Sequence, residues 1–184
     1  MCGIAGIITP NASNYRAELQ KMTDAIAHRG PDSAHQEFYE NAALGHRRLS
    51  IVDLSETGKQ PMFSQTKNEC IVLNGEIYGY LDLKKKYSNY HYRGTSDTEV
   101  ILAMYEQKGN ALLDELPGMF AFAIWNEEKQ ELFCARDRFG EKPFYYAHGK
   151  NGEFIFASEM KAILASGLLK PIVNQEAISH FLQY

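Results

Sequence analysis

The chain has 184 residues, of which 45% are hydrophobic and 23% are charged, and its formal net charge is −4. This is the composition of a soluble globular chain long enough for one domain with a real core, so it excludes a disordered protein. The negative charge comes without any basic run or stripe, which argues against nucleic acid or an anionic membrane as the main partner.

The first predicted element is a strand over residues 2–8, an apolar run that begins with Cys2. A turn at residues 10–13 follows, and apolar residues then recur at helical spacing over residues 15–28. The sequence His28-Arg29-Gly30-Pro31-Asp32 is a breaker that ends this predicted helix.

Two strands are expected next, over residues 43–53 and 70–78, and then a helix over residues 95–108. Ser96 is followed three residues later by Glu99, which is a capping-box pattern for the start of that helix. These segments are predicted to be strands and helices of one layered unit, because no repeat or low-complexity linker divides the chain.

Two hairpins give the strongest indication of the fold. Apolar segments 121–125 and 132–135 flank a short polar turn, and segments 144–147 and 154–157 flank a loop that contains Asn-Gly. Hairpins imply antiparallel pairing, yet these strands are apolar on both alternating faces, so both faces must be covered.

Two antiparallel sheets packed on each other with helices outside satisfy this pattern, and we predict an αββα sandwich of the α+β class. Further helices are expected over residues 158–166 and 174–184. The whole chain, residues 1–184, is predicted to be one domain, in which residues 174–184 are either its end or the start of a connection to another domain.

Three cysteines, Cys2, Cys70 and Cys134, form no Cys-x-x-Cys pair, and an odd number cannot pair completely within one chain. We therefore expect reduced thiols and a cytoplasmic location. The six histidines lack metal-ligand spacing, so no metal site is predicted. The apolar N-terminal run has no basic lead and breaks at Thr9-Pro10, so it is expected to be neither a signal peptide nor a membrane span.

Cys2 combines two reactive groups once the initiator Met1 is removed. An α-amine with a pKa of roughly 7.7 to 8.0 can accept the proton of a thiol with a pKa of about 8.5 as the sulfur attacks a carbonyl. The alternative is that Cys2 only begins an apolar strand, because free cysteine is commonly buried.

Three further clusters could complete a site. Arg48 brings a planar guanidinium into an apolar strand, Asn74 and Gly75 offer an amide and an approachable N–H beside Glu76, and Asp97 lies in the first turn of a helix. Each cluster also has a plain structural interpretation, as an edge arginine, a turn and a helix-stabilising carboxylate. Together they describe a site for an amino acid whose side-chain carbonyl is attacked, and glutamine has that shape.

The chain resembles the class II glutamine amidotransferases, which are N-terminal-nucleophile hydrolases with the αββα fold. The resemblance is closest to the glutaminase domain of glutamine-hydrolysing asparagine synthetases and covers essentially all residues. It rests on these motifs in order: Met1-Cys2-Gly3-Ile4, His28-Arg29-Gly30-Pro31-Asp32, Arg48 to Asp53, Asn74-Gly75-Glu76-Ile77-Tyr78, Ser96-Asp97-Thr98-Glu99, Gly118 to Phe122, and Ala157-Ser158-Glu159-Met160-Lys161.

The resemblance implies a role for each matched residue. Cys2 would be the nucleophile with its α-amine as the base, and Asn74 and Gly75 would form the oxyanion hole. The other substrate-binding positions would be Arg48 for the α-carboxylate, Glu76 and Asp97 for the α-ammonium, and Leu49, Ser50, Ile51 and Val52 along the pocket. Arg29, Asp32 and the segment Arg136 to Gly140 are expected to be structural or to contact another domain.

Two departures from the family are visible. Gly79 stands where the family usually has asparagine, which affects the loop or a partner contact rather than the reacting groups. Nothing after Tyr184 supplies the Ser-Gly-Gly-x-Asp-Ser phosphate loop of a synthetase, so no cofactor is expected in this chain, and ATP and Mg²⁺ would serve only a synthetase domain or subunit that accepts the ammonia. An oligomer is compatible with the sequence.

Two other functions remain open at this stage. An acylase with an N-terminal cysteine would need an apolar pocket, against which Arg48 and Asp97 argue, and a catalytically inactive interaction module is disfavoured by Cys2. Pro31 favours the asparagine synthetase type over the hexosamine-phosphate and phosphoribosyl-amine types. The ammonia acceptor could be aspartate or another carboxylate, such as a sugar acid.

Overall fold

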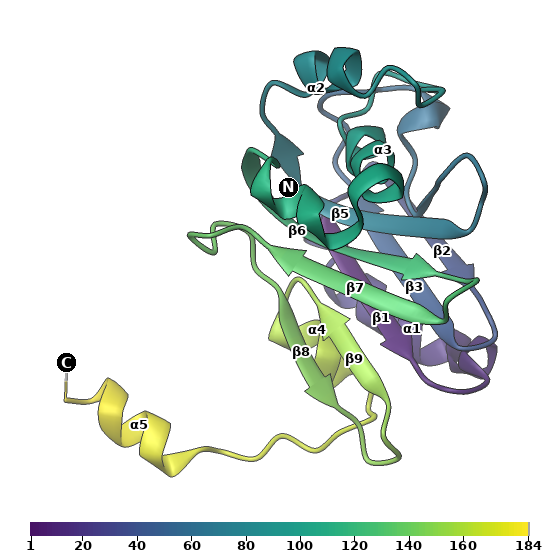
Figure 1. Cartoon of the computed structure of the whole chain (residues 1–184). Coiled ribbons are helices and arrows are strands. Elements are labelled where there is room, and N and C mark those ends of the chain that lie inside the picture. Colours follow the sequence, from purple (N-terminus) through teal and green to yellow (C-terminus); the bar gives the residue numbers. More distant parts are fainter. Residues whose placement is uncertain (184) are drawn as a thin grey trace.

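The computed structural model describes residues 1–183 and shows two antiparallel sheets packed face to face (Figure 1). The first sheet has the order β2-β3-β1-β9-β8, with β1 at Gly3–Ile8, β2 at Ser33–Phe38, β3 at Ala42–Arg48, β8 at Tyr145–His148 and β9 at Phe154–Ala157. The second has the order β4-β5-β6-β7, with β4 at Met62–Phe63, β5 at Glu69–Ile77, β6 at Gly118–Asn126 and β7 at Glu131–Arg136.

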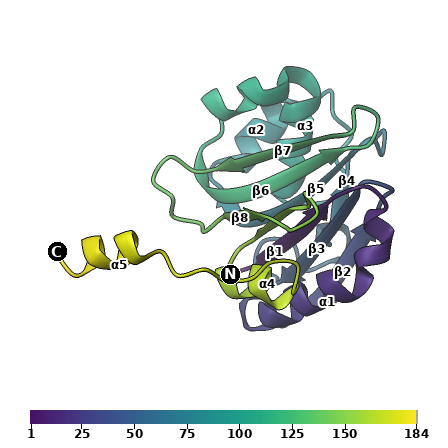
Figure 2. The ribbon, with the colours of Figure 1, turned by 90° about the horizontal axis from the view of Figure 1, so that it is seen from below.

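Helices cover the outer face of each sheet, which completes four layers (Figure 2). Helices α1 (Arg16–Ala25) and α4 (Met160–Ala165) lie against the first sheet, and α2 (Tyr80–Lys86) and α3 (Thr98–Lys108) lie over the second. The predicted αββα sandwich is therefore confirmed. Both predicted hairpins are present, as β6–β7 and β8–β9.

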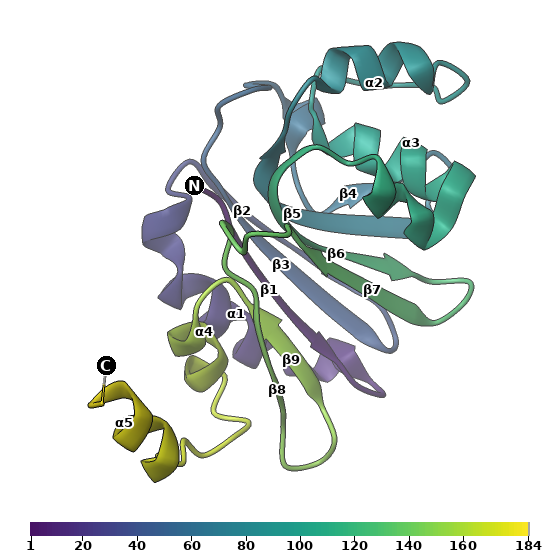
Figure 3. The same ribbon diagram turned by 60° about the vertical axis from the view of Figure 1, so that its left-hand side comes forward.

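Most strands are apolar on both faces because they lie between two layers. On β1, Ile4 packs into the core between the sheets, whereas Ala5 and Ile7 pack under α1. The edge strand β8 differs: Tyr145 and Tyr146 remain 42% and 65% exposed. The expectation that both faces of every hairpin strand are covered is wrong for β8, which lies at the edge of its sheet (Figure 3).

Several predicted boundaries differ from the structure. The strand predicted over residues 43–53 ends at Arg48, and a loop with a 3₁₀ turn at Glu56–Gly58 follows. The helix predicted over residues 15–28 ends at Ala25 and continues as a 3₁₀ turn, Ala27–Arg29. Strands β2 and β4 and helix α2 were not predicted, because their segments are short or rich in polar residues.

The predicted capping box is also wrong. Helix α3 begins at Thr98, and Ser96 accepts a hydrogen bond from the Thr98 N–H at 3.1 Å. The Glu99 carboxylate accepts hydrogen bonds from the N–H groups of Arg93 and Gly94, at 2.9 and 3.0 Å, instead of from Ser96. Glu99 thus fixes the loop that leads into the helix.

The end of the chain stands away from the two sheets (Figure 1). Helix α5 covers Gln175–Phe181 within the predicted range 174–184, of which Tyr184 lies outside the described residues. Its apolar residues Ile178 and Phe181 are 48% and 83% exposed, so among residues 1–183 this helix finds no core to pack on. Within the same range, none of the helices is both long and apolar enough to cross a membrane.

Candidate active site

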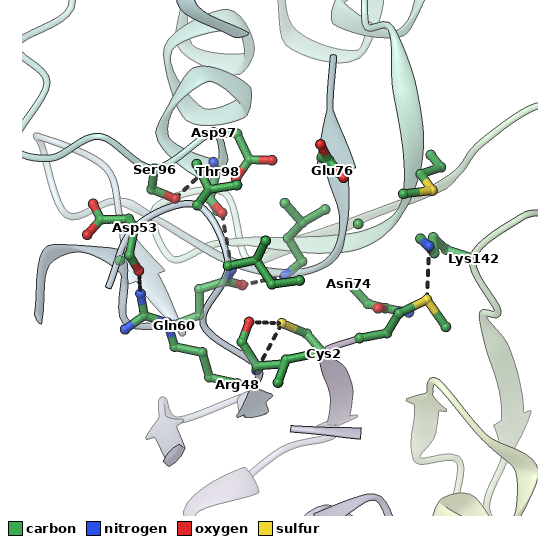
Figure 4. A pocket seen from close by; sticks show the side chains of 18 residues that line it. Cys2, Arg48, Asp53, Gln60, Asn74, Glu76, Ser96, Asp97, Thr98 and Lys142 are labelled. Atoms are coloured by element: carbon green, nitrogen blue, oxygen red, sulfur yellow. Dashed lines mark hydrogen bonds between the residues drawn. The ribbon is translucent and has the colours of Figure 1, made fainter. Parts of the chain in front are cut away.

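A pocket of about 100 Å³ opens at the end of the sandwich where β1 begins and β3 and β5 end. It is lined by the two residues before β1, the end of β3 and the loop after it, the second half of β5 and the start of α3 (Figure 4). The predicted site residues among its lining are Cys2, Arg48, Leu49, Ile51, Val52, Asn74, Gly75, Glu76 and Asp97. Ser50 is not in the lining: its N–H donates to the Asp32 carboxylate at 2.7 Å.

The Cys2 thiol contacts both backbone groups of one residue. The Leu49 N–H donates to Sγ at 3.5 Å, and Sγ lies 3.6 Å from the Leu49 carbonyl oxygen (Figure 4). Burial raises the pKa of Cys2, and the Leu49 hydrogen bond opposes this only in part. The thiol therefore needs a base to become a nucleophile.

The other two cysteines have no comparable setting. Burial raises the pKa of both Cys70 and Cys134 to about 12, and neither lines the pocket. Among the residues that the structure describes, no three potential metal ligands gather at one place. Cys2 is thus the one cysteine of the three that faces a pocket.

Two distant motifs hold the backbone around Cys2. Arg29 donates from Nε to the Cys2 carbonyl oxygen at 2.9 Å, and its Nη1 lies 3.1 Å from the Glu159 carboxylate. The Ser158 hydroxyl accepts a hydrogen bond from the Ile4 N–H at 3.0 Å. Partial burial would raise the pKa of Glu159, but hydrogen bonds from Arg29 and its other partners lower it to about 2.

Strand β5 has an open edge beside the pocket because β4 is short. Strand β4 pairs only with Cys70 and Ile71, so side chains replace the missing strand farther along β5. The Leu73 N–H donates to Gln60 Oε1 at 2.6 Å, and the Ile77 N–H donates to Asp97 Oδ2 at 2.9 Å. Alternate residues of a strand point their N–H groups to the same edge, so the Gly75 N–H between them also points to this edge.

Asn74 lies next to that N–H and is fully buried. Neither its Nδ2 nor its Oδ1 has a hydrogen-bond partner among the described residues. A buried amide without partners costs free energy, and such groups are rare unless a ligand or water completes them. Gly75 is needed for space, because a Cβ there would lie 2.5 Å from the Met119 carbonyl oxygen.

Opposite charges lie at two sides of the pocket. Arg48 is only 8% exposed, and its guanidinium donates to the carbonyl oxygens of Ser55 and Asp53. These bonds use two of its five N–H donors, so others remain for a carboxylate. Asp97 is 6% exposed, and burial together with the nearby Glu76 raises its pKa, so a cation placed here would stabilise its ionised form.

The pocket thus combines a thiol, an unpartnered amide, a strand edge, a guanidinium and carboxylates, and comparison with known proteins agrees with this chemistry. A family model described as "Glutamine amidotransferase domain" matches residues 1–184. The chain belongs to this family.

Named relatives of this amidotransferase domain are longer proteins. The chain is 43% identical to "Putative asparagine synthetase [glutamine-hydrolyzing] 2" of Methanocaldococcus jannaschii over 97% of the chain and 38% of that protein. It is 41% identical to "Asparagine synthetase B [glutamine-hydrolyzing]" of Escherichia coli over 89% of the chain and 30% of that protein. The chain therefore spans well under half the length of these relatives.

A solved structure shows the same fold. The glutamine phosphoribosylpyrophosphate amidotransferase of Bacillus subtilis, complexed with ADP and GMP, superposes with a TM-score of 0.76. The match covers 90% of this chain and 44% of the other at 22% sequence identity. At that identity the likeness extends to the fold alone.

Several residues around the amidotransferase pocket were not predicted as site residues. Gln60, Asp53 and Lys142 line it, and His46 lies behind it. Lys142 donates from Nζ to the Met1 sulfur at 2.9 Å, so this buried ammonium faces the N-terminus. Asp53 accepts hydrogen bonds from Ser55, Thr57 and Thr95, which lower the pKa of its carboxyl although burial opposes them. At His46 and Asp53 a polar residue interrupts an apolar run and could have indicated them, whereas Gln60 and Lys142 lie in polar segments that carry no such signal.

Gly79, the departure noted in the sequence, has a local explanation. Its φ of 61° lies in the left-handed region, at the start of α2. Glycine adopts this conformation freely, and asparagine is enriched there among the other residues, so either residue suits the turn. The change therefore leaves the pocket geometry unaffected.

Proposed function

We propose that this domain hydrolyses glutamine to glutamate and ammonia through a thioester on Cys2. The observation that carries the proposal is the Cys2 thiol in one pocket with Asn74, a buried amide that has no partner among the described residues. Such an amide, beside the Gly75 N–H, suits a negative oxygen that exists only during a reaction.

The steps follow from these groups. Removal of Met1 frees the α-amine of Cys2, which accepts the thiol proton as Sγ forms a bond to the γ-carbonyl carbon of glutamine. The carbonyl oxygen becomes an oxyanion that receives hydrogen bonds from Asn74 Nδ2 and the Gly75 N–H. As the C–N bond breaks, the α-ammonium of Cys2 gives the proton to the leaving nitrogen. Ammonia then departs, and the thioester remains.

Water completes the cycle. The α-amine accepts a proton from water as the oxygen attacks the thioester carbonyl, and the same two donors stabilise the second oxyanion. The C–S bond then breaks, the proton returns to sulfur, and glutamate leaves. No redox step and no cofactor enters this sequence.

Recognition of the substrate is assigned to the charged groups. Arg48 would bind the α-carboxylate, and Asp97 with Glu76 would bind the α-ammonium, while Leu49, Ile51 and Val52 line the side of the pocket. A simple amide such as butyramide lacks both charges, so it should be a far weaker substrate. This part of the proposal predicts which amides are hydrolysed, and not how fast the chemical step is.

The proposal is tested by ammonia release from glutamine. Cys2→Ala should abolish it and leave the fold intact, whereas Cys134→Ala is a matched control outside the pocket and should retain it. An electrophilic glutamine analogue should add once, at the N-terminal residue. Activity that persists in Cys2→Ala, or labelling at Cys70 or Cys134, would contradict the proposal.

We further propose that the ammonia is delivered to a synthetase region that uses ATP and Mg²⁺ to amidate aspartate. The support is that similar proteins are named glutamine-hydrolysing asparagine synthetases and are much longer than this chain. The three cysteines are unpaired, which suits a reducing, cytoplasmic setting. Incubation of the full-length protein with ATP, aspartate and amide-labelled glutamine should give labelled asparagine, and label found on another carboxylate, such as a sugar acid, would identify a different acceptor.

A further inference from the structure

His46 lies behind the pocket and bonds to the strand that carries the proposed oxyanion donors. It is fully buried on β3, two residues before Arg48, and its Nε2 lies 3.1 Å from the Leu73 carbonyl oxygen. A carbonyl oxygen can only accept, so Nε2 carries the proton and donates it. The hydrogen bond therefore joins the two sheets directly behind the pocket.

The imidazole acts as a neutral donor. Burial lowers the pKa of His46 to about 3 in spite of its bond to Leu73, and Arg48 and His35 act in the same direction. Its Nδ1 has no partner among the described residues, so the ring is held by packing and by this one hydrogen bond. His46 thus supplies an N–H without a charge.

This bond fixes the peptide unit on which Asn74 depends. The Leu73 carbonyl and the Asn74 nitrogen belong to one planar peptide group. Gln60 holds the Leu73 N–H from the same edge, and it is itself fixed by a 3.1 Å hydrogen bond to the Thr98 hydroxyl. The Asn74 side chain has no described partner of its own, so its direction depends on the backbone and on packing.

We propose that His46 is a positioning residue for glutamine hydrolysis: its Nε2–H fixes the Leu73–Asn74 peptide plane and so directs the Asn74 amide and the Gly75 N–H at the reacting oxygen. The inference rests on the proposed glutaminase function. It predicts an effect on the transition state and not on the binding of glutamine, because the substrate charges are assigned to other side chains, those of Arg48, Glu76 and Asp97.

Two amide variants make the test sharp. His46→Gln places an amide nitrogen near the position of Nε2, whereas His46→Asn carries the same amide one methylene closer to the backbone, too far from Leu73. We expect His46→Asn to lower kcat roughly 10- to 100-fold with KM changed less than about threefold, and His46→Gln to recover most of the loss. His35→Gln is the control: His35 is the cross-strand neighbour of His46 and makes no bond to Leu73, so kcat should match the parent.

A second readout separates positioning from a general loss of stability. A glutamine analogue with an aldehyde in place of the amide adds to the Cys2 thiol: the S–C bond forms as the C=O π bond opens, the thiol proton passes to the Cys2 α-amine, and the aldehyde oxygen takes the place of the oxyanion. His46→Asn should weaken inhibition by this aldehyde by a factor similar to the loss in kcat, while inhibition by 2-aminobutyrate, which carries both α-charges and no side-chain oxygen, stays unchanged. Circular dichroism and thermal melting identify variants that fold.

Different outcomes test the role of His46 and the proposed function. A folded His46→Asn with the parent kcat, a loss confined to KM, or aldehyde affinity that stays constant while kcat falls would each overturn the inference. If His46→Asn does not fold, His46→Gln and His46→Leu are compared by the same aldehyde assay, and equal affinities overturn it. A parent protein that releases no ammonia from glutamine would instead refute the proposed function.

Discussion

Replacing Asn74 by alanine should slow glutamine hydrolysis without destabilising the protein. The parent residue is fully buried, and neither atom of its amide has a hydrogen-bond partner among the described residues. An unsatisfied buried polar group costs about 1–3 kcal/mol, and removing it also removes that cost. The space left behind costs about 1 kcal/mol, so we expect the free energy of unfolding to stay constant or to rise by up to about 2 kcal/mol.

The same substitution, Asn74→Ala, should lower the rate of glutamine hydrolysis although it does not lower stability. Loss of one oxyanion donor lowers kcat roughly 10²- to 10³-fold, which corresponds to about 2.7–4 kcal/mol of transition-state stabilisation. KM should change little, because the carboxylate and ammonium of the substrate are assigned to other residues, Arg48, Glu76 and Asp97. Asn74→Ala would therefore lower activity while the free energy of unfolding stays constant or rises.

Asn126 is a matched control on the neighbouring strand. It is 3% exposed, and its amide is satisfied: Nδ2 donates to Glu69 at 2.9 Å and Oδ1 accepts from the Lys129 N–H at 2.8 Å. Asn126→Ala should lower the free energy of unfolding by about 2–3 kcal/mol and leave kcat unchanged.

Urea unfolding followed by circular dichroism gives the stability of each variant, and ammonia release gives kcat. The reasoning is refuted if Asn74→Ala loses as much stability as Asn126→Ala. It is equally refuted if Asn74→Ala keeps the parent kcat.

Three further predictions use other parts of the site. A chain that begins at Cys2 should be active, and one that retains Met1 should be inactive, because an amide nitrogen cannot accept the thiol proton. Mass spectrometry defines the N-terminus of each sample, and equal activities would contradict the role of the amine. Arg48→Met should weaken glutamine binding by about 2–5 kcal/mol and leave butyramide hydrolysis unchanged, so a parallel loss for both amides would argue against a carboxylate clamp. The pKa of Glu159 is lowered from 4.5 to about 2, so its contribution to stability is present above pH 4.5 and is lost as the pH falls towards 2. Glu159→Gln should therefore flatten the melting temperature over that pH range, and an unchanged pH dependence would show that the ion pair with Arg29 contributes no stability.

The layers of the fold could be predicted because burial on both faces leaves a mark on the sequence. Strands such as 121–125 are apolar at every position, and only a four-layer arrangement covers both of their faces. Strand β2 carries Ser, His, Gln and Glu, and no local pattern distinguishes it from a loop. Its position is determined by pairing with β3, which is a tertiary effect.

After β3, the sequence predicts a strand where the structure has a loop. Ile51 and Val52 look like a continuation of the strand, but they are 69% and 37% exposed in the structure. Arg48 ends the strand there, because its guanidinium binds the carbonyl oxygens of Ser55 and Asp53 and so turns the chain back on itself. The apolar residues that follow line a pocket and do not pack in a core.

The motifs and their order predict which residues form the site, but they do not predict the contacts that hold these residues in place. Reading the sequence brings Cys2, Asn74 and Asp97 together as a set, because a glutamine site needs those chemical groups. It does not show that Gln60 and His46 bind the backbone of Leu73, since those contacts depend on how far β4 extends along β5. A one-residue shift in register would exchange the faces of the strand.

The short strand β4 thus explains why the site lies where it does. A full-length neighbour would have paired with residues 73–77 and consumed the N–H groups on that edge of β5 in ordinary sheet hydrogen bonds. Because β4 begins only at Met62, which pairs with Ile71, two of those N–H groups are taken by the side chains of Gln60 and Asp97, and the Gly75 N–H between them lies on the same edge beside the pocket. An oxyanion donor of the kind proposed for Gly75 needs no special turn, only a strand that loses its partner beside the proposed nucleophile. The conformation of this edge then depends on a few side-chain contacts, and this is why His46, which lies behind the pocket and bonds to Leu73, should affect the rate.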